Sequence, residues 1–103
     1  MSIDVRTIAY EADGLALEGI LATPAGDGRR PAVLIAHEGP GLDDVQRDRA
    51  RVYAELGYVA FAMDYHGALA PFAERTAMMQ RIGALIEDPL RTRRYGLAAL
   101  EVL

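Results

Sequence analysis

Two short apolar runs, separated by a helical pattern, are the feature of this sequence that most restricts its fold. The runs are Pro31–Ala36 and Tyr58–Met63. Each has the length of one strand and lacks the polar alternation of a strand with one face in water, which is typical of strands covered on both faces. Such strands belong to parallel sheets whose connections are helices. The pattern therefore predicts an α/β fold.

The segment between the two runs, residues 44–56, has the periodicity of a helix. Asp43 or Asp44 can cap its start, and Gly57 can end it. The aliphatic stem of one arginine, Arg49, takes part in the predicted apolar stripe of this helix. The stripe consists of Val45, Arg49, Val52, Tyr53 and Leu56.

The flanking segments extend this α/β pattern. Residues 3–12 and 15–23 surround Asp13-Gly14, a dipeptide favoured in tight hairpins, and residues 25–30 form a polar loop. A longer helix is expected over about residues 70–87, and Asp88-Pro89 is typical of the start of a third helix that continues to residue 103. The sequence thus predicts an N-terminal β-hairpin followed by βαβα units of a mostly parallel sheet. The predicted apolar face of the longer helix consists of Phe72, Met79, Ile82 and Ile86.

The composition excludes several classes of function. The net charge is −4, which argues against a nucleic-acid surface, and no apolar run approaches the roughly 18 residues that cross a bilayer. There is no cysteine, so thiolate chemistry is excluded within this chain. All 11 basic residues are arginine, and the lysine that P-loop and Schiff-base chemistry require is therefore missing. We expect a soluble cytoplasmic protein, without cofactor and without membrane or nucleic-acid partners. Arginine in place of lysine is typical of a GC-rich bacterial genome.

Polar residues follow directly on both apolar runs. His37 and Glu38 end the first run, and Asp64 and His66 follow the second. Because parallel strands of one sheet end at the same edge, these four groups are expected on one rim, where open α/β sheets place their chemistry.

Several interpretations of this rim remain open. The His37 ring can be a packed residue that bonds neighbouring backbone, and Asp64 can anchor its loop. The four groups together have the donor types of a zinc or manganese site, but their spacing is no known metal signature, and we expect no metal here. A small flavodoxin-like domain is a further possibility for the fold, although a glycine-rich phosphate loop is missing.

Residues 31–67 resemble the dienelactone hydrolase family of α/β-hydrolases. The likeness rests on PAVLIAHEGPGL and on RDRARVYAELGYVAFAMDYHG. These segments repeat the family pattern of an apolar strand, His-Glu, a Gly-containing loop, an Arg-Asp helix, Gly-Tyr, and a strand that ends in Asp and an aromatic residue. The hairpin and the arginine-rich third helix also fit. The resemblance implies that residues 1–103 are a single N-terminal portion of an α/β-hydrolase domain, with an incomplete α/β-hydrolase fold.

The resemblance also implies roles for the rim. Glu38 would lie near the nucleophile and influence its ionisation, and the Gly39 N–H would donate to the oxyanion hole. The expected substrate-lining residues are His37, Pro40, Tyr65 and His66. The family nucleophile, usually a cysteine, would lie roughly 15–25 residues beyond Leu103, judging by usual element lengths.

Two functions follow as expectations. One is the N-terminal part of a hydrolase that acts on small carboxylic esters or lactones, and conceivably on phosphotriesters. The alternative is a non-catalytic fragment that self-associates or pairs with a complementary C-terminal fragment, because a half-sheet leaves residues 32–36 as an exposed apolar edge. Whether the chain alone is an enzyme stays open, since Ser2 is its only serine.

Overall fold

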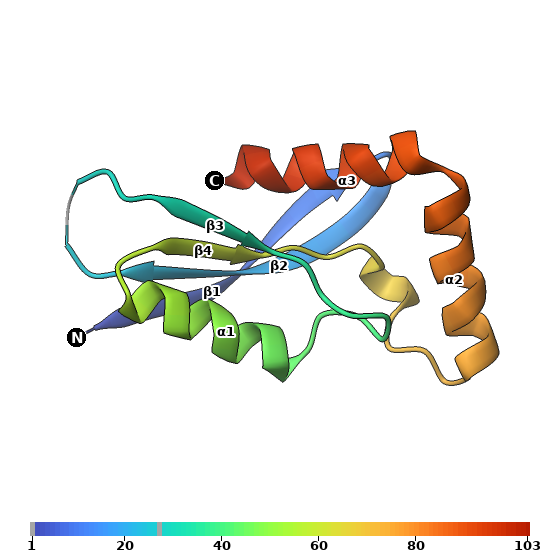
Figure 1. The fold of residues 1–103 in the computed structure, drawn as a ribbon, viewed down its shortest axis with the longest axis horizontal. Coiled ribbons are helices and arrows are strands. Elements are labelled where there is room, and N and C mark those ends of the chain that lie inside the picture. Colours follow the sequence, from blue (N-terminus) through green and yellow to red (C-terminus); the bar gives the residue numbers. More distant parts are fainter. Residues whose placement is uncertain (1, 27) are drawn as a thin grey trace.

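A computed structural model describes residues 2–26 and 28–103 as a four-stranded sheet with helices on both faces (Figure 1). The elements in chain order are β1 (Ile3–Ala12), β2 (Leu15–Pro24), β3 (Ala32–Ile35), α1 (Asp44–Glu55), β4 (Val59–Ala62), the 3-10 turn η1 (Gly67–Leu69), α2 (Arg75–Glu87) and α3 (Pro89–Val102). This order confirms the α/β class and the succession of hairpin, strand, helix, strand and helices.

The sheet has the strand order β1-β2-β4-β3, so β4 lies between the hairpin and β3. β3 and β4 are parallel, whereas β2 pairs antiparallel with both β1 and β4. Within these residues the expected parallel pairing is therefore limited to β3 and β4, because the hairpin contributes half of the strands. β3 forms an edge of the sheet, as the sequence predicted for residues 32–36.

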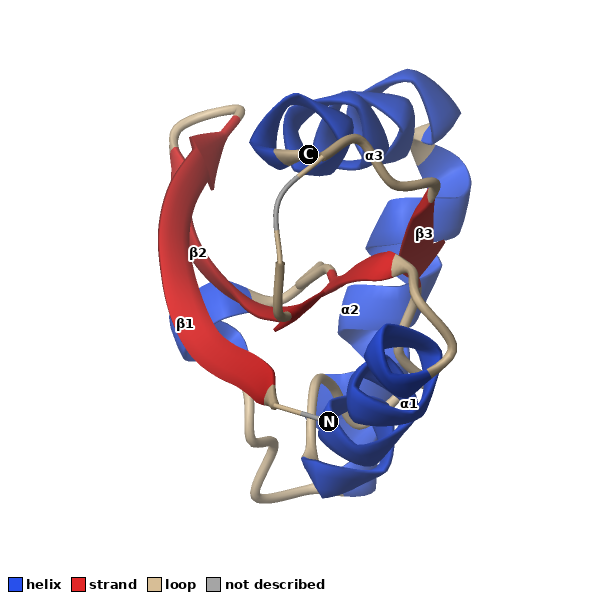
Figure 2. Cartoon of the chain, turned by 90° about the vertical axis from the view of Figure 1, so that its left-hand side faces the viewer, coloured by secondary structure: helices blue, strands red, loops and turns tan. Residues whose placement is uncertain are grey.

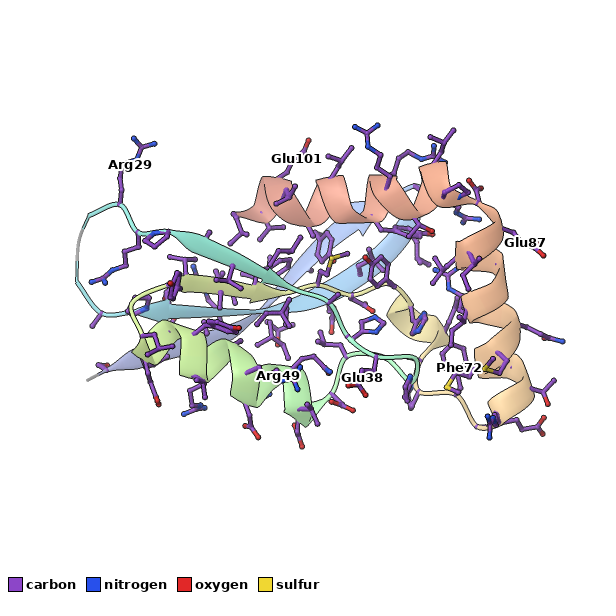
Figure 3. The ribbon with its side chains drawn as sticks, viewed as in Figure 1. Arg29, Glu38, Arg49, Phe72, Glu87 and Glu101 are labelled. Atoms are coloured by element: carbon purple, nitrogen blue, oxygen red, sulfur yellow. The ribbon has the colours of Figure 1, made fainter. Side chains whose placement is uncertain are left out.

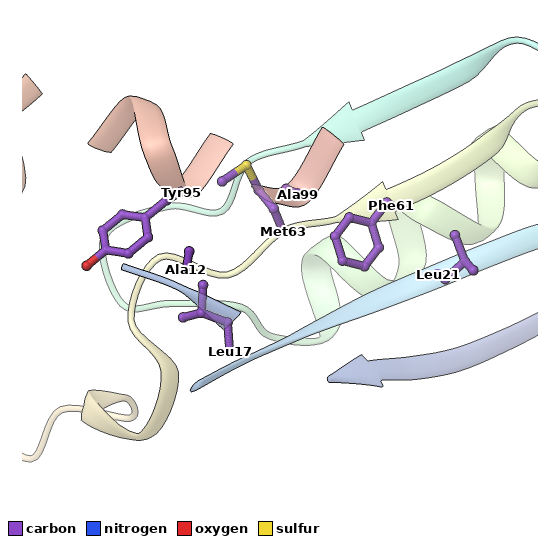
Figure 4. Close-up of a cluster of buried hydrophobic side chains, with 7 residues drawn as sticks. All are labelled: Ala12, Leu17, Leu21, Phe61, Met63, Tyr95 and Ala99. Carbon is purple, nitrogen blue, oxygen red and sulfur yellow. The ribbon is translucent and has the colours of Figure 1, made fainter. Parts of the chain in front are cut away.

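The two sheet faces carry two separate apolar clusters, and Figure 2 shows the sheet between α1 and α3. Side chains of alternate residues point to opposite faces of a strand, which divides the core in this way. The cluster beneath α1 contains Ile20, Ala22, Ile35, Ala50, Ala54, Ala60 and Ala62. The cluster beneath α3, drawn in Figure 4, contains Ala12, Leu17, Leu21, Phe61, Met63, Tyr95 and Ala99.

Helix α1 begins as expected, with the Asp43 side chain accepting from the Val45 N–H in a capping box. The predicted apolar stripe of this helix is not the face that the structure buries. Val52 and Leu56 are 53% and 68% exposed, and the face toward the sheet consists of Gln46, Ala50 and Ala54. The small alanine side chains let the helix axis approach the sheet closely, whereas the bulky stripe points away from it.

Helix α2 begins at Arg75, five residues later than the predicted start at residue 70. Pro71 disfavours a helical conformation for the residue before it, and η1 and a loop fill this segment instead. Phe72 therefore lies outside the helix whose face it was expected to share. Helix α3 begins as predicted, with Asp88 as its N-cap and Pro89 in its first turn.

The hairpin turn also has the predicted conformation, because Asp13 and Gly14 both have positive φ, at 52° and 78°. The Asp13 carboxylate forms ion pairs with Arg91 and Arg94, at 2.8 Å and 3.0 Å, which connect the hairpin to α3. Among the described residues, no helix is long and apolar enough to cross a membrane.

Candidate active site

His37 follows the end of β3, and its ring connects the two loops of the rim. Its Nε2 accepts a hydrogen bond from the Tyr65 N–H at 2.9 Å, and its Nδ1 lies 2.7 Å from the Glu38 carbonyl oxygen. Because Nε2 accepts and a carbonyl cannot donate, Nδ1 carries the proton and the imidazole is neutral. The side chain is 2% exposed, so it lies inside the rim rather than on its surface.

Asp64 organises the loop that follows β4. Its carboxylate accepts from the N–H groups of His66 at 2.9 Å, Gly67 at 3.0 Å and Glu18 at 3.2 Å. The Tyr10 hydroxyl accepts from the Asp64 N–H at 3.0 Å and donates to its carbonyl. These bonds confirm the expectation that Asp64 anchors this loop, and they hold the β4 loop against the hairpin.

His66 is buried, 1% exposed, and its Nε2–H donates to the Gly39 carbonyl at 2.9 Å. Its Nδ1 is buried and has no partner within the described part of the chain. Burial lowers the pKa of this imidazole, because a charge is costly away from water, and the nearby His37 and Arg81 side chains lower it further. His66 therefore fixes the loop after β3 as a neutral ring.

The peptide between Glu38 and Gly39 lies in a turn, and hydrogen bonds to its carbonyl fix its orientation. The Glu38 carbonyl accepts from His37 Nδ1 and from the Gly41 N–H at 3.1 Å. In a trans peptide the N–H points opposite to the C=O, so the Gly39 N–H points away from both donors. In residues 2–26 and 28–103 it has no hydrogen-bond partner, and the carboxylate of the exposed residue Glu38 has none either. Figure 3 labels Glu38 in the segment between β3 and α1.

A cleft of about 850 Å³ lies near this turn, between the hairpin, the first turn of α1 and the η1 loop. Of the six residues predicted for the site, Pro40 lines it. Tyr65 packs instead against His37, with ring centroids 5.3 Å apart. The structure thus brings Glu38, Gly39, His37 and His66 together and places the cleft to one side of them.

Arg81 is a residue of this region that the sequence analysis did not select. Its guanidinium donates to the Tyr65 carbonyl and lies 5.7 Å from the centre of the Tyr95 ring. The sequence feature that could have identified Arg81 is a single arginine next to the apolar positions Met78 and Ile82 of α2.

Two of the four residues considered for a metal site have other partners. Both nitrogens of His37 are engaged, and the Asp64 carboxylate accepts from backbone N–H groups. No group of three or more His, Asp or Glu side chains in the described ranges has an arrangement that would hold a metal ion.

Comparisons with known proteins identify the family and the fold. The model of the dienelactone hydrolase family matches residues 17–101. A solved structure named m3DLH superposes with a TM-score of 0.90 at 31% identity, over 98% of this chain and 42% of that one. A dienelactone hydrolase-like promiscuous phosphotriesterase from metagenomic libraries superposes with a TM-score of 0.89 at 30% identity, over 100% of this chain and 43% of that one.

A curated relative is similar over a shorter segment. It is YghX of Escherichia coli (strain K12), named as a hydrolase fragment, and it is 43% identical over 49 residues, which are 47% of this chain and 42% of the relative. The chain spans less than half the length of each of these three proteins. Because the family model covers most of the described strands and helices, the chain belongs to the dienelactone hydrolase family.

Proposed function

We propose that this chain supplies the carboxylate and one oxyanion donor of a hydrolase site that acts on carboxylic esters or lactones. The observation that carries the proposal is the Gly39 N–H, which has no hydrogen-bond partner among the described residues and follows the exposed Glu38 at the carboxyl end of β3. Ester hydrolysis places negative charge on the former carbonyl oxygen, and a backbone N–H held in advance stabilises that charge.

His37 and His66 hold this donor in place. His37 and the Gly41 N–H fix the carbonyl of the Glu38–Gly39 peptide, and His66 fixes the carbonyl of the next peptide. With both carbonyls fixed, the Gly39 N–H needs no reorganisation when an oxyanion forms. His37 and His66 thus serve as positioning residues, beneath a surface on which Glu38 and Pro40 would meet the substrate.

The nucleophile in this proposal comes from outside these residues. The chain has no cysteine, and Ser2 lies at its terminus, far along the chain from the rim. Phosphotriesters are a second substrate class, because one of the similar structures is named a promiscuous phosphotriesterase and a phosphoryl oxygen gains negative charge in the same manner.

The test is to join the chain to the part of m3DLH that it does not cover, and to assay hydrolysis of an activated aryl ester. We expect turnover from the joined protein and none from the 103-residue chain alone. A joined protein that folds but does not hydrolyse esters would contradict the proposal. Turnover by the isolated chain would contradict the need for an outside nucleophile, and its loss on adding a chelator would indicate metal chemistry at the rim.

A second candidate function is self-association or pairing with a complementary C-terminal fragment. The observation that favours it is the position of β3, which within residues 2–26 and 28–103 has a neighbouring strand, β4, on one side only. Unpaired strand edges are sites of association with other chains. Sedimentation of the purified chain tests this function, and a monomer at all concentrations would contradict self-association.

A further inference from the structure

The backbone of Tyr65 lies between helix α2 and the ring of His37. Its carbonyl accepts from the Arg81 guanidinium, and its N–H donates to His37 Nε2 at 2.9 Å. The His37 Nδ1–H donates in turn to the Glu38 carbonyl at 2.7 Å, and this carbonyl belongs to the peptide that carries the Gly39 N–H. Three successive hydrogen bonds therefore connect an arginine of α2 to the proposed oxyanion donor.

The two peptides on either side of the Tyr65 Cα are also held at their other ends. The Tyr10 hydroxyl donates to the Asp64 carbonyl at 3.3 Å, and the His66 N–H donates to the Asp64 carboxylate at 2.9 Å. The Tyr65 carbonyl has Arg81 as its one hydrogen-bond partner among the described residues. Removing this bond therefore frees a single group in a segment that is otherwise fixed.

The Arg81 side chain is itself held in place. Its guanidinium centre lies 5.7 Å from the centre of the Tyr95 ring, where cations are attracted to aromatic faces. Tyr95 is fully buried on α3, and its ring lies edge-to-face with the Tyr65 ring, with 6.3 Å between the centroids. An arginine held on a buried ring loses little conformational freedom when it donates to the Tyr65 carbonyl.

We infer that Arg81 is a positioning residue for the Gly39 N–H and acts on it through Tyr65 and His37. The inference rests on the hydrolase function proposed above and gives an arginine of α2 a part in that reaction. A donor held in advance stabilises the charge that develops in the transition state, and a small displacement of the donor is costly. Loss of Arg81 should therefore lower kcat and leave KM nearly unchanged.

The kinetic test uses the joined protein described above and a neutral activated aryl ester, which offers no carboxylate for an arginine to bind. We expect Arg81→Met to lower kcat on the order of tenfold, with KM changed by less than about twofold. Arg81→Lys should recover part of the loss, because its ammonium still donates to the carbonyl. Arg93→Met makes the same charge change at an exposed position of α3 and should behave as wild type. A higher KM with unchanged kcat would overturn the inference.

The route through His37 is tested by a double-mutant cycle in the same protein. His37→Phe should lower kcat, and Arg81→Met should then have a smaller effect than it has in the wild type, because the connection is already broken. Equal effects of Arg81→Met in both backgrounds would overturn this route. If circular dichroism shows that Arg81→Met does not fold, Arg81→Gln, a shorter polar side chain, replaces it with the same expectations.

A second measurement does not depend on hydrolysis. Nuclear magnetic resonance of the 103-residue chain follows the exchange of the His37 ring proton with water, and this proton is buried and hydrogen-bonded. We expect slow exchange in the wild type and in Arg93→Met, and faster exchange in Arg81→Met. Unchanged exchange in Arg81→Met would overturn the inference. The expected exchange pattern together with an inactive joined protein would contradict the proposed function and support the connection from Arg81 to His37.

Discussion

Burial of His66 makes the stability of the fold depend on pH. Its ring is 1% exposed, it donates to the Gly39 carbonyl, and burial lowers its pKa below the ordinary value of 6.5. Above pH 6.5 the imidazole is neutral in both the folded and the unfolded chain. In this range the residue makes its full contribution to the free energy of unfolding. Below pH 6.5 the unfolded chain binds a proton that the folded chain does not, so the free energy of unfolding falls.

The size of this effect has an upper limit. If the folded ring binds no proton down to pH 5.5, one histidine with an unfolded pKa of 6.5 lowers the free energy of unfolding by about 1.4 kcal/mol between pH 7.5 and pH 5.5. A chain of this size has a total stability of only several kcal/mol, so a loss near this limit is measurable. His66→Phe removes it, at a cost of about 1 kcal/mol at pH 7.5 for the lost hydrogen bond to Gly39.

The assay is urea unfolding followed by circular dichroism at pH 7.5, 6.5 and 5.5, at one ionic strength and one protein concentration. We expect His66→Phe to start lower than wild type and to lose less stability on acidification. The wild-type chain, measured in parallel, is the reference, because His37 and His66 are the two histidines of the chain and His37 is present in both proteins. If His66→Phe kept the full pH dependence of the wild type, the account of this residue would be refuted.

Four further substitutions test hydrogen bonding and packing in the fold. Asp64→Asn should lower the free energy of unfolding by about 2 kcal/mol in urea melts, because an amide N–H₂ cannot accept from the backbone N–H groups that the carboxylate holds. Gly19→Ala should destabilise by about 1–3 kcal/mol, since its Cβ would lie 2.2 Å from the Phe61 ring, whereas Gly96→Ala, with nothing within 4 Å, should stabilise α3 by about 0.5–1 kcal/mol. Ala54→Leu should lower the melting temperature, because Ala54 is fully buried against the sheet.

The succession of elements could be predicted from the sequence because each carries a local signal. Asp13-Gly14 requires a turn with positive φ, and Asp88 with Pro89 favours a helix start whatever surrounds it. The order of the strands has no such signal. The insertion of β4 between β2 and β3 depends on pairing between segments that lie far apart in the sequence.

The buried face of α1 could not be predicted from apolar periodicity. Apolar periodicity selects Val52 and Leu56 as the buried residues. Contact with the sheet depends instead on how closely the helix can approach it, and small side chains such as Ala50 and Ala54 allow the closest approach. The bulky stripe stays exposed in these 103 residues, which cover less than half of the solved relatives.

The chemistry of the rim was only partly accessible from the sequence. Its location followed from the ends of two apolar runs, which placed His37 and His66 close together. The partner of each ring could not be predicted, because His37 accepts from the Tyr65 N–H and His66 donates to the Gly39 carbonyl, 28 and 27 residues away along the chain. These bonds show that both rings support the Glu38 turn, and their contact with substrate stays a prediction.

The central claim, that Glu38 acts in ester hydrolysis, is tested most directly by the kcat/KM of the chain joined to the uncovered part of m3DLH. We predict that Glu38→Gln lowers kcat/KM on the order of 10²-fold, within the range for acid–base groups, and that Glu38→Asp lowers it less. Glu87→Gln removes the same charge at the exposed end of α2 and should leave the value unchanged. A Glu38→Gln protein as active as the Glu87→Gln protein would contradict the account.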